Sequence, residues 1–173
     1  MPANEKFEIR GVNHLALVCK DMKRTVDFYS GILGMPLTKT IDLPNGMGQH
    51  FFFDIGKGDS LAFFWFPDAP ESQPGVTHPE AMVGKGSIVS AHASMNHIAF
   101  DVPEAKIEEY QQRLEEAGVE VTKVVNHDDS PTQASPTITD STFVRSVYFR
   151  DPDGIMLEFA SWTREMTAND VDW

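Results

Sequence analysis

The sequence predicts an α+β protein built from two tandem βαβββ modules, each forming a curved mixed sheet. The first observation is an internal repeat: Asn-His, an aliphatic residue and Ala occur in this order twice, with His14 and His97 as the matched histidines. These histidines are offset by 83 residues (97 − 14). The second observation is that each copy continues with one helical pattern and three strand-like runs. Two copies favour a pseudo-symmetric pair over a solenoid, which needs three or more repeats.

The first module is predicted over residues 9–66. It opens with a strand near 12–18, and apolar residues then recur at helical spacing until Gly34, a residue that favours helix ends. The residues of this apolar stripe are Met22, Val26, Tyr29 and Leu33. Three strands, near 37–42, 49–55 and 60–66, complete the module.

The second module is predicted over residues 95–162 and has the same order of elements. Its first strand lies near 95–101, and its helix begins after Pro103 and ends at Gly118. The apolar stripe of this helix consists of Ile107, Tyr110 and Leu114. The three strands that follow lie near 120–125, 143–150 and 155–161.

The remaining segments are predicted as loops around one domain of 173 residues. Residues 67–94 contain four prolines and many Gly and Ser, which indicates a long surface loop between the modules. A second insertion, "NHDDSPTQASPTITDS", begins at Asn126, and residues 163–173 form a C-terminal tail. Loops this long in a compact domain are usually functional or flexible.

Composition excludes several classes of partner. Lys and Arg number 14 against 26 Asp and Glu, so the formal charge of −12 repels phosphate backbones and disfavours nucleic acid. No apolar run approaches the roughly 20 residues of a membrane helix, and the N-terminus has no signal-peptide pattern. A single cysteine, Cys19, excludes an internal disulfide and suggests the reducing cytosol. We therefore expect a cytoplasmic protein that binds neither membrane nor nucleic acid.

Glu158 is the residue that raises a chemical question. It lies within an apolar strand, and a lone buried carboxylate is costly unless it is paired, protonated or bound to metal. Strand alternation places it on one face with Met156 and Ala160. His14 and His97 lie at equivalent points of the two modules. Two imidazoles and one carboxylate form a facial triad with open positions, so the sequence predicts a metal site in a cleft shared by the two sheets.

A single strand histidine is more often a hydrogen-bonded core residue than a metal ligand. The repeat changes this balance, because it matches two histidines and adds an acid in an apolar strand. The metal interpretation is therefore preferred for His14, His97 and Glu158 together.

The motifs "NHLAL", "NHIAF" and "DPDGIMLEF" resemble those of the vicinal oxygen chelate superfamily, and the resemblance covers about residues 9–162. Its members include glyoxalase I, methylmalonyl-CoA epimerase, fosfomycin-resistance proteins and extradiol ring-cleaving dioxygenases. The resemblance implies His14, His97 and Glu158 as metal ligands, a small-molecule substrate and a homodimer.

The number of ligands bears on the reaction. Glyoxalases and epimerases usually carry a fourth ligand in the first module, but Ala62 in "DSLAFF" takes the place that Glu158 has in "GIMLEF". Gln49 and His50 are substitutes one strand earlier, against which the register argues. Three ligands resemble the dioxygenase pattern. Tyr148, ten residues before Glu158, also fits the Y-x-x-x-P-x-G-x-x-x-E arrangement of extradiol enzymes.

The sequence does not single out one residue as the catalytic acid or base. Extradiol enzymes often carry "HHSLAF", with a histidine as acid/base, whereas this chain has "KGDSLAFF" with Asp59 at that position. Asp59 is therefore a candidate base or a simple turn residue. Further acid/base candidates are His50, His92 and His127. The residues predicted to contact substrate are His50, Phe64, His127 and Arg145.

Three functional hypotheses follow. The leading one is an Fe(II) dioxygenase acting on a catechol-like or other oxygen-chelating molecule. In the second, Zn²⁺, Ni²⁺, Co²⁺ or Mn²⁺ acts as a Lewis acid in a lyase, isomerase or transferase. The third is a non-enzymatic binding protein like the bleomycin-resistance proteins, which lack the metal triad.

Overall fold

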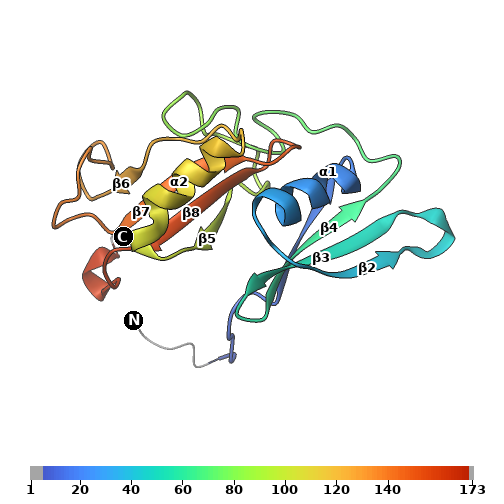
Figure 1. Cartoon of the computed structure of the whole chain (residues 1–173). Coiled ribbons are helices and arrows are strands. Elements are labelled where there is room, and N and C mark those ends of the chain that lie inside the picture. Colours follow the sequence, from blue (N-terminus) through green and yellow to red (C-terminus); the bar gives the residue numbers. More distant parts are fainter. Residues whose placement is uncertain (1–5, 172–173) are drawn as a thin grey trace. The chain divides into compact units, whose positions relative to one another are not determined.

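The computed structural model describes residues 6–171, which form two compact units (Figure 1). The N-terminal unit comprises Glu8–Gln73 and Asp151–Ile155. The C-terminal unit comprises Pro74–Arg150 and the described residues from Met156 onward. Each unit contains one four-stranded sheet, and each is described below by itself.

The sheet of the N-terminal unit has the strand order β1-β4-β3-β2. Strand β1 (His14–Cys19) runs parallel to β4 (Asp59–Trp65). Strand β3 (Gln49–Gly56) is antiparallel to both β4 and β2 (Leu37–Asp42). The predicted strands near 37–42, 49–55 and 60–66 are thus found within a residue of their expected bounds.

A helical segment covers one face of this sheet. It begins as α1 (Met22–Val26), where the Asp21 side chain accepts a hydrogen bond from the Arg24 N–H as an N-cap, and continues as a π-helix (Asp27–Ile32). Tyr29 is fully buried and packs on Phe53 and Phe63, with ring centroids 5.7 and 4.9 Å away. The sequence predicted one regular helix. The spacing of the apolar residues does not indicate that its second half is a π-helix.

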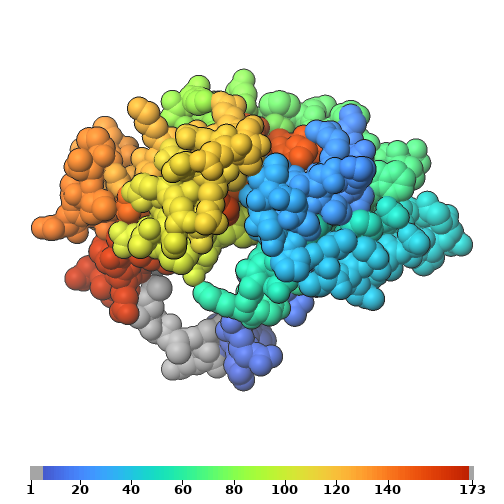
Figure 2. All heavy atoms as spheres, viewed as in Figure 1, coloured from blue at the N-terminus to red at the C-terminus, as the bar shows by residue number. Residues whose placement is uncertain are grey.

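The sheet of the C-terminal unit has the order β5-β8-β7-β6. Its strands are β5 (Ile98–Asp101), β8 (Met156–Trp162), β7 (Val144–Arg150) and β6 (Val125–His127). A 3-10 turn (Glu104–Lys106) leads into α2 (Ile107–Glu116). Helix α2 packs on one face of this sheet, where the ring of Tyr110 lies 5.8 Å from that of Phe159. The atoms of this helix are the yellow spheres in Figure 2. The C-terminal tail adds a 3-10 turn (Ala168–Asp170).

The predicted strand near 120–125 is wrong in position. Strand β6 begins only at Val125, and residue 121 makes an isolated bridge with Phe149. Thr122 explains the interruption, since its hydroxyl accepts the Tyr148 N–H (3.0 Å) while its carbonyl accepts from the Gln111 side chain. A side-chain oxygen thus replaces a backbone carbonyl in the ladder, which sequence alternation does not indicate.

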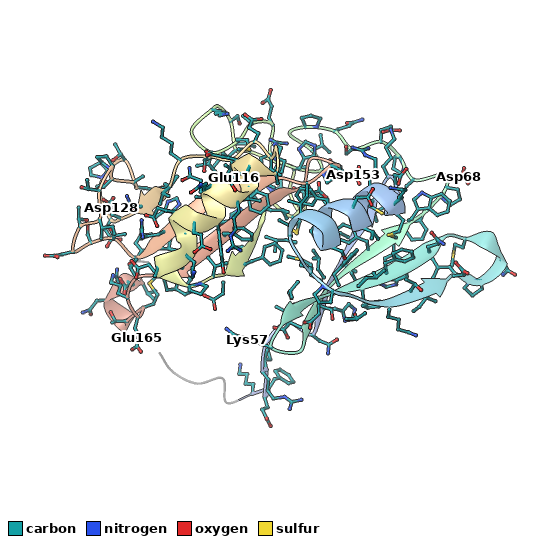
Figure 3. The ribbon with its side chains drawn as sticks, viewed as in Figure 1. Lys57, Asp68, Glu116, Asp128, Asp153 and Glu165 are labelled. Carbon is teal, nitrogen blue, oxygen red and sulfur yellow. The ribbon has the colours of Figure 1, made fainter. Side chains whose placement is uncertain are left out.

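Two connecting segments, the turn before β8 and the inter-module loop, each pack with one of the units. The turn before β8 belongs to the N-terminal unit, where Asp153, labelled in Figure 3, accepts the Lys20 N–H at 2.8 Å. From Pro74 onward the inter-module loop belongs to the C-terminal unit. It is anchored there by Arg150, which donates to the Pro79 carbonyl at 2.8 Å and contacts the buried His78.

The predicted fold class is confirmed: both sheets have the βαβββ order, with the first and last strands parallel. The expectation that the sheets surround a shared metal cleft stays a prediction. Among residues 6–171, no helix has the length and apolarity to cross a bilayer.

Candidate metal centre

A histidine and a carboxylate meet on one face of the C-terminal sheet. His97 lies directly before β5, and Glu158 lies in β8 opposite Ala99 of β5. The His97 Nε2 atom is 3.1 Å from Glu158 Oε2. The two residues that the sequence assigns to a metal site in this module are therefore adjacent.

Glu158 is buried and supported from the neighbouring strand. Only 4% of its surface is exposed, and Ser146 of β7 donates a hydrogen bond to its Oε1 atom. Burial disfavours the charged form, but hydrogen bonds from His97 and Ser146 outweigh it, so the pKa of Glu158 lies below its ordinary value. The carboxylate is thus ionised at neutral pH and already oriented.

Tyr148 lies directly opposite Glu158 in the β7–β8 ladder. It is buried, its hydroxyl is 3.0 Å from Nε2 of His127, and its ring meets that of His97 edge-on at 5.9 Å. Burial and the nearby Glu158 raise the pKa of Tyr148 far above its ordinary value, so the phenol stays neutral. Tyr148 therefore shares a face with His97 and Glu158, the candidate ligands of this unit.

The inter-module loop gives this cluster an apolar border. Met82 of the loop packs against Tyr148 and Met156, and Val83 and Val125 adjoin them. Such an apolar surround lowers the local dielectric and strengthens the polar contacts within it.

The hydrogen bonds around His97 test whether the site fits a cation. The Asn96 Nδ2 group donates to the Ile88 carbonyl at 2.8 Å, which leaves Asn96 Oδ1 as the acceptor 2.9 Å from His97 Nδ1. Nδ1 therefore carries a hydrogen, which leaves Nε2 as the ring atom that faces the ionised Glu158. Either a second proton or a metal ion must lie between the two acceptors. A nitrogen and an oxygen donor in this arrangement suit a divalent ion.

His14 repeats part of this arrangement in the N-terminal unit. Its Nδ1 atom is 2.7 Å from Asn13 Oδ1, and the ring is exposed on β1. Its Nε2 atom is thus directed away from the asparagine.

The register identifies Ala62 as the counterpart of Glu158. Ala16 pairs with Ala62 in the first sheet, and its repeat partner Ala99 pairs with Glu158 in the second. A letter-by-letter alignment of "DSLAFF" with "GIMLEF" would instead place Phe63 there, but Phe63 is buried on the helix side with Tyr29. The first module therefore has no carboxylate at this position.

The same register makes His50 the counterpart of Ser146. His50 pairs with Phe64 and stands diagonally to Ala62, just as Ser146 pairs with Ala160 and stands diagonally to Glu158. Its ring lies against Phe64 and stacks on Phe52, with centroids 3.6 and 4.3 Å apart. Burial and the nearby His14 lower the pKa of His50, and its buried Nε2 has no hydrogen-bond partner among residues 6–171.

Two of the predicted residues lie on the opposite faces of their sheets. Asp59 neighbours Ser60, which pairs with His14, so alternation turns Asp59 toward the helix side. Arg145 is nearly buried among Glu108 of α2 and Asn126, to which its Nε donates at 3.1 Å. Neither residue therefore joins the cluster of its own unit, whereas Phe64 lies on the His14 face.

Sequence reasoning missed Ser146, Asn13 and Asn96. The two asparagines had a visible signal, because Asn precedes the histidine in both copies of the repeat. Within each unit, the described residues contain no group of three His, Cys, Asp or Glu side chains gathered for a metal. A centre made of His14, His97 and Glu158 together stays a prediction.

The fold and these residues define a class of paired βαβββ proteins with a histidine–carboxylate pair in the second module. The chain belongs to the Glyoxalase/Bleomycin resistance protein/Dioxygenase superfamily, which its sequence matches over residues 11–159.

Curated relatives span most of the chain at low identity. The metallothiol transferase FosB of Shouchella clausii is 26% identical over 156 residues, covering 90% of this chain and 82% of FosB. The lactoylglutathione lyase of Pseudomonas aeruginosa is 28% identical over 170 aligned positions, covering 89% of this chain and 85% of the lyase.

Solved structures share the fold. A glyoxalase family protein from Enterococcus faecalis superposes with a TM-score of 0.62 at 21% identity, covering 89% of this chain and 99% of that protein. The fosfomycin resistance protein FosX of Listeria monocytogenes, in complex with Mn(II) and sulfate, gives 0.56 at 21% identity, covering 90% and 94%.

Proposed function

We propose that this protein is a metal-dependent enzyme in which His14, His97 and Glu158 hold one divalent ion, and that it is an Fe(II) extradiol-type dioxygenase. Its substrate would be a small catechol-like molecule with two adjacent oxygens. The observation that carries this proposal is the position of Tyr148. Its hydroxyl lies on the face of Glu158 and His97, and the position equivalent to Glu158 in the first module is Ala62, which cannot bind a metal.

The metal would supply positive charge for adjacent substrate oxygens and for dioxygen. The chain's residues have separate tasks. Glu158 contributes the neutralising charge, and Ser146 fixes its carboxylate plane. Tyr148 would be a neutral donor for charge that develops on substrate oxygen, and His127, 3.0 Å from its hydroxyl, would orient that hydroxyl. Met82 and Met156 keep water from this side.

A second candidate is Lewis-acid chemistry with Mn²⁺, Zn²⁺, Ni²⁺ or Co²⁺. It is favoured by the names of the relatives, a metallothiol transferase and a lactoylglutathione lyase, and by the Mn(II) complex of FosX. The same residues would then stabilise an enolate or polarise an epoxide. A non-enzymatic binding protein ranks last, because both modules carry their Asn-His sequence and the second carries its acid.

Cytoplasmic location and a homodimer belong to the same proposal. The single cysteine suits a reducing compartment, and the family resemblance favours pairing. A monomer in sedimentation would remove the dimer.

The decisive experiment measures metal content after anaerobic purification and then oxygen uptake on a catechol panel. Bound iron with oxygen consumption supports the dioxygenase. Zinc, manganese or nickel with no uptake overturns it in favour of the Lewis-acid enzyme. No retained metal and no dependence on added metal would exclude both.

A further inference from the structure

An asparagine precedes the candidate ligand in both modules, and both asparagines make the same bond. Asn13 Oδ1 is 2.7 Å from His14 Nδ1, and Asn96 Oδ1 is 2.9 Å from His97 Nδ1. The two contacts lie in different units and in different surroundings, so neither is a consequence of the other. Their recurrence links the repeated dipeptide to a task beyond forming a strand.

At Asn96, contacts of the carboxamide nitrogen with the inter-module loop fix the orientation of the side chain. Its Nδ2 donates to the Ile88 carbonyl at 2.8 Å and approaches Ser90 Oγ at 3.3 Å. Both partners belong to the inter-module loop. A carboxamide whose nitrogen is occupied in this way can offer only its oxygen to His97.

An acceptor at Nδ1 selects the tautomer of a neutral imidazole. With a hydrogen held on Nδ1, Nε2 is the atom left for a metal. In metal-free His97 this atom carries a second proton toward Glu158, which a bound cation would replace. Without the acceptor, the hydrogen can occupy Nε2 and block the atom that would bind metal. An outer partner of this kind also fixes the plane of the ring.

We infer that Asn13 and Asn96 are positioning residues, which keep a hydrogen on Nδ1 of His14 and of His97 so that Nε2 of each ring is the atom presented to a divalent cation. Through Asn96, the inter-module loop sets one of these rings. The expected effect on metal affinity rests on the proposed metal centre. The position of the imidazole hydrogen and the orientation of the ring do not, because they are properties of the metal-free chain.

The test uses the full chain carrying Asn13→Leu, Asn13→Asp or Asn96→Leu. Leucine matches asparagine in shape but accepts no hydrogen bond, whereas aspartate at position 13 retains the acceptor. Asn96→Asp is unsuitable, since its second oxygen would face the Ile88 carbonyl. Imidazole ¹⁵N spectra of the metal-free proteins report the protonated nitrogen, with His14→Ala and His97→Ala as assignment variants. Titration with Mn²⁺ alone reports affinity.

We expect Asn13→Leu to move the hydrogen of His14 from Nδ1 to Nε2, to leave the His97 signals unchanged and to weaken Mn²⁺ binding about 10- to 100-fold. Asn96→Leu should leave the His14 signals unchanged and weaken Mn²⁺ binding by a similar factor, whereas Asn13→Asp should behave like the wild type. His97 gives no tautomer readout, because Glu158 keeps a proton on its Nε2 atom in the metal-free chain. The inference is overturned if His14 keeps its Nδ1–H in Asn13→Leu, or if the tautomer moves while Mn²⁺ affinity holds. Absence of Mn²⁺ binding in the wild type would count against the metal centre, and the spectra would still decide the tautomer.

Discussion

At the scale of single residues, Tyr148 distinguishes the two enzymatic proposals. We expect Tyr148→Phe to keep its metal and fold, because the ring stays packed on Met82 and Met156 and one lost hydrogen bond costs about 1 kcal/mol. If the enzyme cleaves rings, turnover should fall about 10²- to 10³-fold, as expected when a donor aimed at developing charge is removed. Steady-state oxygen uptake on an active substrate measures this. Unchanged turnover would favour the Lewis-acid chemistry.

His50 presents a different residue-scale conflict, since its Nε2 is buried without a partner. A buried unsatisfied polar atom costs about 1–3 kcal/mol. Phenylalanine would retain the contacts with Phe52 and Phe64 without that cost. We therefore expect His50→Phe to raise the free energy of unfolding of the metal-free protein by about 1 kcal/mol, measured by urea titration.

The functional consequence of His50→Phe gives the second half of this prediction. A residue that is kept at the expense of stability is typical of a functional site, so activity should fall as stability rises. His92→Phe, at an exposed position, is the control and should change neither quantity. A variant that is stabilised and fully active would show that His50 contacts no substrate.

At the scale of elements, the turn before β8 makes stability depend on pH. Burial raises the pKa of Asp151 from 3.8 to about 6, although the N–H groups of Asp153 and Ile155 and the Tyr29 hydroxyl bond its carboxylate. The folded state therefore binds this proton more tightly than the unfolded chain does. The corresponding stability is complete below about pH 4 and is lost as pH rises through about 6.

Asp151→Asn isolates this effect, because asparagine keeps the shape and one acceptor oxygen. We expect the free energy of unfolding of the wild type, relative to Asp151→Asn, to fall by up to about 3 kcal/mol between pH 4 and pH 7. Urea titrations of both proteins at several pH values measure it. A constant difference across this range would mean that the Asp151 carboxyl titrates normally in the folded state.

For the strands, the alternation of apolar and polar residues predicted which side chains share a face. Strand alternation put Glu158 on the face of Met156, and in the structure Glu158 is buried there, opposite Tyr148. Tertiary hydrogen bonds decided the rest. The Thr122 hydroxyl interrupts a strand, and Glu108 holds the guanidinium of Arg145 on the helix side, where alternation with Ser146 already places this residue. Such partners lie tens of residues away in sequence, so no local pattern announces them.

At the scale of the whole molecule, the two units carry different parts of one predicted centre. His14 belongs to the N-terminal unit, and His97 and Glu158 belong to the C-terminal unit. The register explains the division, since the position equivalent to Glu158 in the first module is Ala62. A metal bound by all three residues would bind the folded chain only, and would therefore stabilise both units together.

This linkage gives the last prediction. An ion present at about 100 times its dissociation constant stabilises the state that binds it by about 2.7 kcal/mol. We expect a chelator to lower the unfolding temperature of the wild type, and added Mn²⁺ or Fe²⁺ to restore it. His14→Ala, His97→Ala and Glu158→Gln should each abolish the response, since two ligands hold a divalent ion weakly.

Glu158→Gln is the most stringent of the three, because glutamine keeps the size of the side chain and an acceptor for Ser146 while removing the charge. Calorimetry with and without chelator measures the shift. If His14→Ala retained the full response while Glu158→Gln lost it, the metal would be a ligand of the C-terminal unit alone, and the three-residue centre would be wrong.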